Sequence, residues 1–281
     1  MPELPDLTIY LERLAKLLAG ERLEAIRIAN PFVLRSVTPP PSDLVGRRVE
    51  EIARLGKRLV IGLEQERFVV CHLMIAGRLH WKRSGQAIPK GRGLAALDFP
   101  PGSLLLTEAR KKRRASLHLV KGRSELRVFD RGGLEVLGAD AAQFATVMRT
   151  KNHTLKRALT DPSVLAGIGN AYSDEILHHA GLSPFKQTHA LSDDEMERLQ
   201  HATQAILSEW TDRLRAATGD GFPDKVTAFR AGRRCTAALA SLARCARRRF
   251  KESFMPKTRP TIARVAKPMG NCSSTVLFPL C

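Results

Sequence analysis

Acidic residues are too few in this sequence to balance the basic ones, and long apolar runs are missing. The chain has 28 Asp and Glu against 46 Lys and Arg, which gives a formal net charge of +18 and a pI of about 10.4. An excess of this size is unusual for an enzyme of small metabolites. It favours a polyanionic partner, most often nucleic acid, with an anionic membrane surface as the alternative. No stretch approaches the roughly 20 apolar residues of a membrane span, and no secretory signal is recognisable, so we expect a cytoplasmic protein.

Cysteine is also scarce, and its spacing excludes the usual cysteine-based sites. The five cysteines are Cys71, Cys235, Cys245, Cys272 and Cys281. An odd number without a secretory signal argues against a framework of disulfide bonds. Because no two of them form a CxxC pair, the chain as written predicts no zinc site.

The first half of the chain consists of a short helical segment followed by short apolar runs. Residues 1–18 have apolar side chains at helical spacing and predict one amphipathic helix. From Glu24 to about Val136 the apolar runs are separated by glycine and proline, which indicates the short strands of a sandwich or barrel. The clearest runs are Arg58–Leu63, Arg67–Leu73, Ala95–Phe99, Ser103–Thr107, Ser116–Val120 and Leu126–Phe129.

The second half changes to a helical pattern. The last helix is expected to begin with a capping box formed by Ser192 and Glu195. We predict a β domain over residues 1–133, a helical domain over 134–230 and a basic, disordered tail over 231–281. The predicted helices are Ala141–Arg149, Thr154–Leu159, Ser163–Ala180 and Ser192–Ala217.

The opening residues Met-Pro-Glu-Leu-Pro-Asp have two interpretations. A Met before Pro2 is normally removed, which leaves a secondary amine at the N-terminus. A free α-amino group titrates near pH ~8, so part of it is unprotonated at neutral pH. It can then attack an aldehyde-level carbon while Glu3 moves a proton. The alternative is a plain helix start, where proline and acids are both common; these six residues alone favour that alternative.

Lys57 and two further segments can be interpreted from their local sequence. Lys57, just before a predicted strand, is by its local sequence a surface lysine. The turn within His72–Leu79 either packs into the core or exposes Met74 or Ile75 as a wedge between stacked bases. The basic run Arg110–Arg114 is either a solvated face or a phosphate contact.

Residues Leu165–Glu175 form the most specific internal segment. Gly167 and Gly169 precede Asn170 at the opening of a helical run. Such a turn allows close backbone approach and presents N–H groups to an anion, to which Asn170 adds a side-chain donor. A dinucleotide-binding motif is disfavoured, because no strand precedes the segment and the glycine spacing differs.

Taken together, these segments resemble the formamidopyrimidine-DNA glycosylase and endonuclease VIII family. The family's opening PELPE corresponds to Pro2–Asp6 with one acidic exchange, and its GK before a strand corresponds to Gly56-Lys57. Its HLGMSG corresponds to His72–Gly77, and its AGIGNIYADE to Ala166–Glu175. The resemblance covers about residues 2–230, in the same order and at similar separations.

The resemblance implies an α+β, multidomain protein: an antiparallel β-sandwich with a leading helix, then a helix–two-turn–helix domain. It also implies a monomeric base-excision repair enzyme, without a membrane partner, that flips a damaged base out of duplex DNA. Pro2 would excise the base through a Schiff base and cut the strand by β- or β,δ-elimination. Glu3 would shuttle a proton, and Lys57 would contact a phosphate and assist. The implied DNA contacts are Met74, Ile75, Arg110, Lys156, Gly169, Asn170 and Tyr172.

The chain departs from the family pattern at the expected wedge. The family's methionine aligns with Ile75, while Met74 replaces a glycine. Arg110 matches the family's arginine, but the phenylalanine that accompanies it there is absent from Arg110–Lys112. We expect Met74 or Ile75 to fill the gap left by the flipped nucleotide.

The tail departs most, because the family usually ends in a zinc finger with two CxxC pairs. A change of frame near Phe229–Arg234 permits such pairs within Leu242–Ala246 and Ile262–Lys267. We hypothesise a single-base insertion or deletion, or a sequencing error; the alternative is a natural basic tail. A structural zinc contributes on the order of 10 kcal/mol to folding. Its loss predicts retained non-specific DNA binding and weakened catalysis.

Two other functions stay open on the sequence alone. One is a non-catalytic protein that binds damaged DNA without cutting it. An unprocessed Met1 would favour this, because Pro2 would then lack a free amine. The other is a basic, ribosome- or RNA-associated protein, which would prefer single-stranded RNA to damaged duplex.

Overall fold

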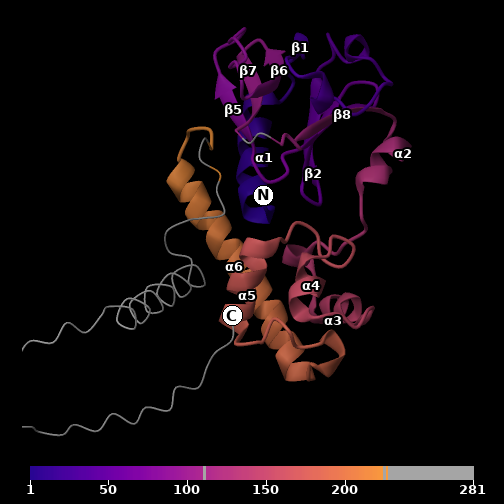
Figure 1. The fold of residues 1–281 in the computed structure, drawn as a ribbon, viewed down its shortest axis with the longest axis vertical. Helices are drawn as coiled ribbons and strands as arrows, with labels where there is room; N and C mark the ends of the chain where they lie inside the picture. The colour runs from indigo at the N-terminus through magenta and orange to yellow at the C-terminus, as the bar shows by residue number, and fades with distance from the viewer. Residues whose placement is uncertain (110–111, 224–225, 227–281) are drawn as a thin grey trace, which may run out of the picture. The chain divides into compact units, whose positions relative to one another are not determined.

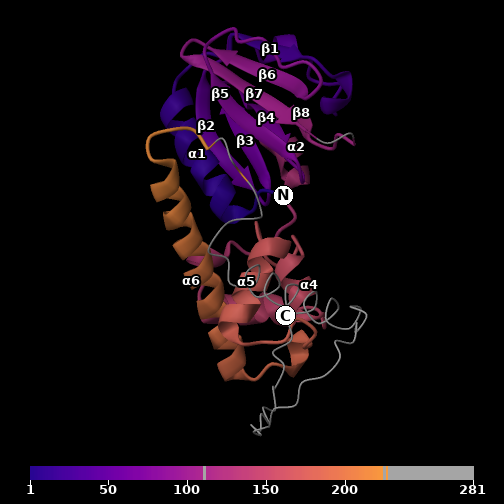
Figure 2. The same ribbon diagram turned by 60° about the vertical axis from the view of Figure 1, so that its left-hand side comes forward.

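The computed structural model describes residues 1–109, 112–223 and 226, and residues 1–228 form one compact unit. Helix α1 (Leu4–Leu18) comes first, strands follow, and the other helices come last (Figures 1 and 2). The strands are β1 (Ala25–Ile28), β2 (Val49–Leu55), β3 (Arg58–Leu63), β4 (Arg67–His72), β5 (Gly77–Lys82), β6 (Gly93–Phe99), β7 (Gly102–Glu108) and β8 (Ser116–Lys121). The later helices are α2 (Arg123–Leu126), α3 (Ala141–Arg149), α4 (Leu155–Thr160), α5 (Asn170–Ala180) and α6 (Asp193–Thr218).

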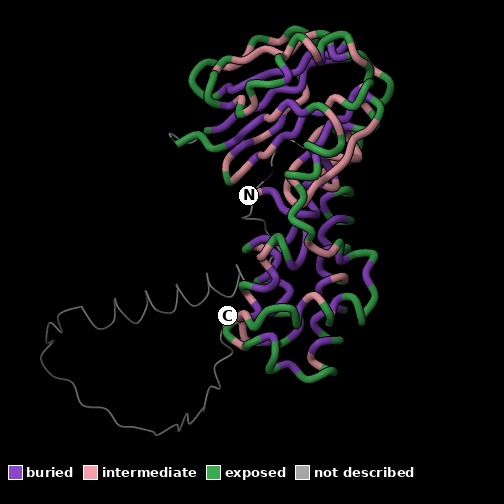
Figure 3. The backbone as a smooth tube through the Cα atoms, turned by 90° about the vertical axis from the view of Figure 1, so that its right-hand side faces the viewer, coloured by how far each residue is buried: buried purple, intermediate pink, exposed green. Residues whose placement is uncertain are grey.

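The strands form two four-stranded antiparallel sheets, in the orders β1-β6-β7-β5 and β2-β3-β4-β8. Alternation along β4 shows why both faces of the second sheet are covered. Val69 and Cys71 point into the core between the sheets, while Phe68 and Val70 point into a smaller outer cluster. Figure 3 shows the resulting run of buried strands. The sandwich and the helical segment that follows confirm the predicted fold class.

Helix α1 connects the two main hydrophobic cores. Its residues Leu7, Tyr10 and Leu14, spaced three and four apart, lie in the core of the sandwich. Leu4, one turn earlier, belongs instead to the core formed by the helices α3–α6. The start of α1 therefore lies beside the helical segment, and Pro2 and Glu3, which precede it, are placed there as well.

Helix α6 begins as predicted. The Ser192 hydroxyl accepts a hydrogen bond from the Glu195 N–H at 3.2 Å, and the Glu195 carboxylate accepts one from the Ser192 N–H at 3.0 Å. This reciprocal pair is the expected capping box, and the helix covers Asp193–Thr218. Within the described residues, no helix is long and apolar enough to cross a membrane.

The predicted strand Leu126–Phe129 is wrong, because this segment is helical: α2 is followed by a 3-10 turn over Arg127–Phe129. Leu126 and Phe129 both pack against the outer face of the second sheet, while Val128 is 78% exposed. A strand would have placed Leu126 and Val128 on the same face. A three-residue spacing of the apolar contacts requires a helical turn.

Two predicted helix starts are also too early. The first helix begins at Leu4, because Glu3 is extended and caps it. The helix predicted over Ser163–Ala180 begins only at Asn170. Gly167 has a φ of 82°, which breaks any helix before it and turns the backbone toward the start of α1.

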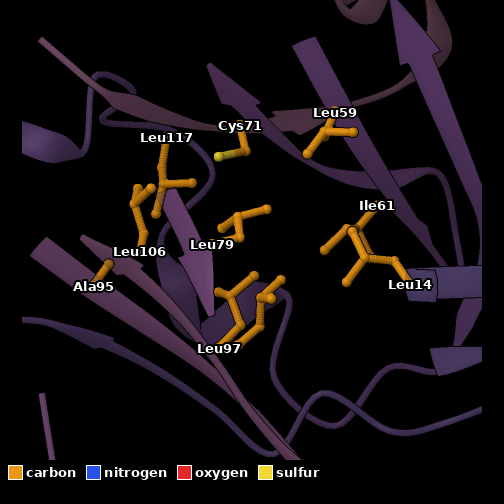
Figure 4. A pocket seen from close by; sticks show the side chains of 10 residues that line it. Leu14, Leu59, Ile61, Cys71, Leu79, Ala95, Leu97, Leu106 and Leu117 are labelled. Carbon is orange, nitrogen blue, oxygen red and sulfur yellow. The ribbon is translucent and has the colours of Figure 1, made fainter. Parts of the chain in front are cut away.

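A small apolar cavity of about 20 Å³ lies inside the sandwich (Figure 4). The side chains around it, including Leu79, Leu97 and Cys71, come from both sheets and α1. The side chains that line this space are almost entirely apolar, so it offers a water molecule no hydrogen-bonding partners and offers no polar group for chemistry. The cavity is a packing defect of the core, and the candidate site lies elsewhere.

Candidate active site

The residues before α1 are buried and held by backbone hydrogen bonds. Pro2 is buried, and Glu3 is only 3% exposed. The Glu3 N–H donates to the Asp6 carboxylate at 3.2 Å, and the Leu4 N–H donates to the Gly167 carbonyl at 2.9 Å. The N-terminal segment is thereby fixed against the turn before α5.

The Glu3 carboxylate accepts three backbone hydrogen bonds from the first turn of α5. The N–H groups of Gly169 (2.8 Å) and Tyr172 (3.1 Å) donate to Oε2, and that of Ala171 (3.0 Å) donates to Oε1. These N–H groups are unused within the helix, and the helix dipole also favours negative charge there. Glu3 is therefore locked at one position from which its carboxylate can exchange protons.

Gly169 is the residue that allows this approach. A Cβ atom added to it would lie 2.5 Å from the carboxyl carbon of Glu3. The nonbonded contacts of a Cβ atom are essentially never this short, so any larger residue would displace the carboxylate. The close backbone approach expected from these glycines is thus directed at Glu3 in the case of Gly169, and at Leu4 in the case of Gly167, where an added Cβ would lie 2.9 Å from the Cβ of Leu4.

Lys57 lies at the tip of the two-residue turn between β2 and β3, where Leu55 pairs with Arg58. Gly56 supplies the positive φ, 57°, that this turn requires. Burial lowers the pKa of Lys57, while the negative charge of Glu3 opposes the shift. The same groups act on the chain's terminal amine: burial lowers the pKa of the half-buried Met1 amine, Glu3 raises it, and Lys57 lowers it further. The terminal amine, Glu3 and Lys57 therefore form one electrostatically coupled cluster.

An ion pair between Arg54 and Glu135 connects the β2–β3 turn to the chain that follows the sandwich. The Arg54 guanidinium donates to the Gly56 carbonyl at 2.6 Å and forms an ion pair with Glu135. Arg54 thus links the turn that contains Lys57 to Glu135, which lies in the segment before α3.

Further basic side chains gather beside Lys57 on the outer face of the second sheet. Burial lowers the pKa of His72 to about 4, and the positive charges of Arg58, Lys57 and His118 lower it further. Burial also lowers the pKa values of Arg58 and His118. Because the lowered pKa leaves His72 neutral at pH 7, the positive charge of this cluster lies on its lysine and arginine, and the neutral imidazole can still donate a hydrogen bond to an external anion. Sequence analysis did not single out Arg58 or His118, although strand alternation places them on the same face as His72.

The turn after β4 presents an exposed apolar side chain. The Gly77 N–H closes the turn by donating to the Leu73 carbonyl at 2.9 Å. Met74 has a φ of 51°, in the left-handed region, and is half-buried, whereas Ile75 is 44% exposed. Of the two residues expected to form the wedge, Ile75 is thus the more accessible.

The remaining predicted residues take different positions around α5. Asn170 is exposed at the start of the helix, and the Lys156 ammonium donates to its carbonyl (2.8 Å) and to Asp174 (2.5 Å). The Tyr172 side chain is fully buried against Trp210, so only its backbone N–H reaches the site. Arg110 lies outside the described residues.

Two family models match most of the chain. The model "Formamidopyrimidine-DNA glycosylase N-terminal domain" matches residues 1–131, and the model "Formamidopyrimidine-DNA glycosylase H2TH domain" matches residues 136–216. The chain belongs to the formamidopyrimidine-DNA glycosylase family. The H2TH match contains α5, whose first turn binds Glu3, so the site joins the two matched segments.

Curated relatives bear the same family name. The formamidopyrimidine-DNA glycosylase of Heliobacterium modesticaldum is 32% identical over 233 residues, covering 80% of this chain and 83% of that protein. That of Desulfitobacterium hafniense is 30% identical over 228 residues, covering 80% and 82%.

Solved structures of this family show the same fold. A complex of the Lactococcus lactis protein with DNA containing an abasic site has a TM-score of 0.68 at 23% identity, covering 75% of this chain and 78% of that one. A variant of the same protein, bound to DNA containing Fapy-dG, gives 0.68 at 24% identity, covering 75% and 79%.

The zinc ion implied by the family does not fit the cysteines that are described. Cys71, the only cysteine in the described part of the chain, is buried in β4, and burial raises the pKa of its thiol to about 12. A zinc ligand must be a thiolate. The described residues also contain no group of three or more His, Cys, Asp or Glu that could hold a metal ion. The tail and its other cysteines lie outside the described residues, so the frameshift hypothesis stays a prediction.

Proposed function

We propose that this family member is a DNA glycosylase of base-excision repair that also cleaves the strand at abasic sites. The observation that carries the proposal is the cluster at the start of α1. A buried N-terminal segment lies beside Lys57, and the Glu3 carboxylate is locked by three N–H groups of α5. The relatives' names and the DNA complexes of the structural neighbours support the choice of damaged duplex DNA as substrate.

Catalysis begins when removal of Met1 exposes the secondary amine of Pro2. Its lone pair attacks C1′ of the damaged nucleotide, and the bond from C1′ to the base breaks. The base leaves with the bonding electron pair and takes up a proton. Glu3, fixed beside the amine, is the group that transfers protons to the sugar or base.

The Pro2 nitrogen then loses its proton, and its lone pair forms a double bond to C1′ as the C1′–O4′ bond of the sugar ring breaks and O4′ takes up a proton. The iminium ion formed in this way makes the neighbouring C2′ proton acidic. Loss of that proton expels the 3′ phosphate by β-elimination and cuts the strand, and a second elimination can release the 5′ phosphate. Hydrolysis of the iminium then frees Pro2. Burial lowers the pKa values of Lys57 and of the Met1 amine. We expect the same burial to lower the pKa of the Pro2 amine once Met1 is removed, which increases the fraction of neutral amine near neutral pH.

The basic side chains around His72 complete the proposed site. Lys57, Arg58, His72 and His118 meet the phosphates next to the flipped nucleotide, and Ile75 occupies the space that the nucleotide leaves. Asn170 and Lys156 meet phosphates at the start of α5. The domain limits 1–133, 134–230 and 231–281, the cytoplasmic location and the monomeric state stay predictions.

The test uses an end-labelled duplex with one formamidopyrimidine lesion and the full-length chain. Strand breaks without alkali would report combined glycosylase and lyase activity. Breaks only after hot alkali would report a glycosylase without a lyase step. Binding to the lesion without breaks under either condition would contradict the proposal and favour the non-catalytic DNA-binding protein.

A further inference from the structure

One buried carboxylate takes no part in the proposed chemistry. Glu108, the last residue of β7, is 2% exposed. Its Oε2 accepts hydrogen bonds from the backbone N–H groups of Arg114 at 2.8 Å and Ala115 at 2.9 Å. Its own N–H donates to the carbonyl of Arg92 at 2.8 Å. A carboxylate is buried at a high cost unless its oxygens are bonded, so these contacts hold the backbone where it enters β8.

The first segment held in this way is basic. Lys112, Arg113 and Arg114 are all exposed, and the Arg113 guanidinium donates to the carbonyl of Gly91. The Glu108 carboxylate bonds the backbone N–H of Arg114, not its side chain. The three basic side chains are therefore exposed to an external anion, while the backbone at the end of the segment is anchored at Arg114 and Ala115.

The second segment is the turn that carries Met74 and Ile75. Glu108 pairs with Gly77, the last residue of this turn, across β5 and β7. A Cβ atom added to Gly77 would lie 3.0 Å from the Cβ of Ala115, so Ala115 packs directly over the base of the turn. The carboxylate that binds the N–H of Ala115 thus also decides how closely the basic segment lies against the turn.

We propose that Glu108 is a positioning residue that couples the basic segment Lys112–Arg114 to the Met74–Ile75 turn. The coupling makes phosphate contacts and the apolar wedge engage the duplex together. Glu108 touches no reacting atom. The role of the wedge rests on the proposed function, whereas the role of the basic segment requires only that the protein binds DNA.

The first experiment measures the affinity for an undamaged duplex at several salt concentrations. The slope of log K against log salt decreases by about 0.9 for each phosphate that the protein no longer neutralises. We expect Glu108→Ala to reduce the slope by about 1 to 2. Glu108→Gln should keep it, because the amide oxygen can still accept both N–H groups. Glu50→Ala, the same deletion at an exposed position of β2, is the matched control and should leave the slope unchanged.

The second readout is the fluorescence of 2-aminopurine next to an abasic site, which rises when a side chain enters the stack. Glu108→Ala should lower this rise, as should Ile75→Ala, while Glu108→Gln should not. A purely structural role would reduce the fraction of protein that binds but would leave the salt slope and the fluorescence per bound duplex unchanged. That result would overturn the proposal.

Should Glu108→Ala fail to fold, Glu108→Asp replaces it, because its side chain is one methylene too short to reach both N–H groups. A reduced slope in Glu108→Asp supports the proposal, and an unchanged slope overturns it. Failure of the proposed function is recognised separately, since the wild-type chain would then leave damaged strands uncut while the salt slopes could still be compared.

Discussion

Glu3 has two roles at the scale of single residues. Its carboxylate ties the N-terminus to the first turn of α5 through three hydrogen bonds, and it is the proposed proton carrier. Hydrogen bonds to charged groups contribute about 1.5–3 kcal/mol each. A substitution at Glu3 therefore affects both stability and chemistry, and the two effects must be measured apart.

Glu3→Gln separates them. The amine of Pro2 remains, so cleavage at a ready-made abasic site should persist. Excision of a damaged base should fall about 10²- to 10⁴-fold, because proton transfer is lost. Single-turnover rates on the two substrates give the comparison. Equal losses on both substrates would mean that Glu3 acts only by holding the N-terminus in place.

Gly169→Ala tests the close approach to Glu3. The added Cβ would lie 2.5 Å from the Glu3 carboxyl carbon, so the carboxylate must move away from α5. We expect at least a 100-fold loss of excision, in line with misplacement of a catalytic group by about 1 Å. Gly138→Ala is the matched control, since Gly138 is exposed and a Cβ there meets nothing within 4 Å. Wild-type excision by Gly169→Ala would contradict the proposed geometry.

His72 gives the protein a pH-dependent stability. Its pKa is about 4 in the folded chain and near 6.5 when unfolded, because burial and neighbouring cations disfavour the charged ring. The unfolded chain therefore binds more protons between these values, and stability is lost as the pH falls from about 6.5 to 4. Between pH 7 and pH 5 this amounts to about 2 kcal/mol.

Urea unfolding at pH 7 and pH 5 measures this effect. The loss on acidification should be smaller by that amount in His72→Gln than in the wild-type chain. His201→Gln, at an exposed position of α6, is the control and should behave as the wild type. An identical loss in His72→Gln would show that the ring is not held neutral.

At the scale of elements, two short turns present groups that we propose to reach the substrate. The β2–β3 turn presents Lys57, and the turn before β5 presents Ile75. Both depend on glycine: Gly56 supplies a positive φ, and a Cβ on Gly77 would lie 2.3 Å from the Leu73 carbonyl. Strands that pair within the sheets flank these turns and limit how far each turn can move.

Ile75→Ala removes the exposed part of the turn before β5. Since Ile75 is 44% exposed, its loss should change the free energy of unfolding by less than about 1 kcal/mol. Excision should fall by about 10-fold or more, because the gap left by the flipped nucleotide stays empty. Val37→Ala, at a 94% exposed apolar position, serves as the control. Unchanged excision by Ile75→Ala would exclude the wedge.

Strands and the last helix could be predicted from the sequence more accurately than helix starts. The strand predicted over Arg58–Leu63 is observed with these bounds, since alternation and flanking glycine act locally. The start of α5 could not be predicted, because Gly167 and the approach of Glu3 depend on tertiary structure. The strand predicted over Leu126–Phe129 was wrong because its apolar residues fit either period over so short a length.

The candidate site was predictable only in part for the same reason. The order of the motifs predicted four site residues, Pro2, Glu3, Lys57 and Asn170. No local pattern, however, predicts that the Glu3 carboxylate accepts hydrogen bonds from the N–H groups of α5. Arg58 and His118 come from strands far apart in the chain. Their proximity to His72 requires the register of β3, β4 and β8. Glu108 could not be identified from the sequence, because its proposed role depends on hydrogen bonds from two backbone N–H groups.

At the scale of the whole molecule, the net charge of +18 is consistent with a polyanionic substrate. The described basic side chains are not evenly distributed. Arg58 and His118 lie near His72 on the outer face of the second sheet, and Lys57 is electrostatically coupled both to His72 and to Glu3. The proposed substrate, damaged duplex DNA, is a polyanion of this kind. The central claim is that the amine of Pro2 is the nucleophile.

Borohydride trapping on a duplex with one abasic site tests that claim most directly. Reduction converts an iminium between protein and sugar into a stable bond, and peptide mass spectrometry then locates the modified residue. We predict an adduct on Pro2, formed by protein from which Met1 has been removed. An adduct on a lysine, or none from processed protein that still binds the duplex, would contradict the account.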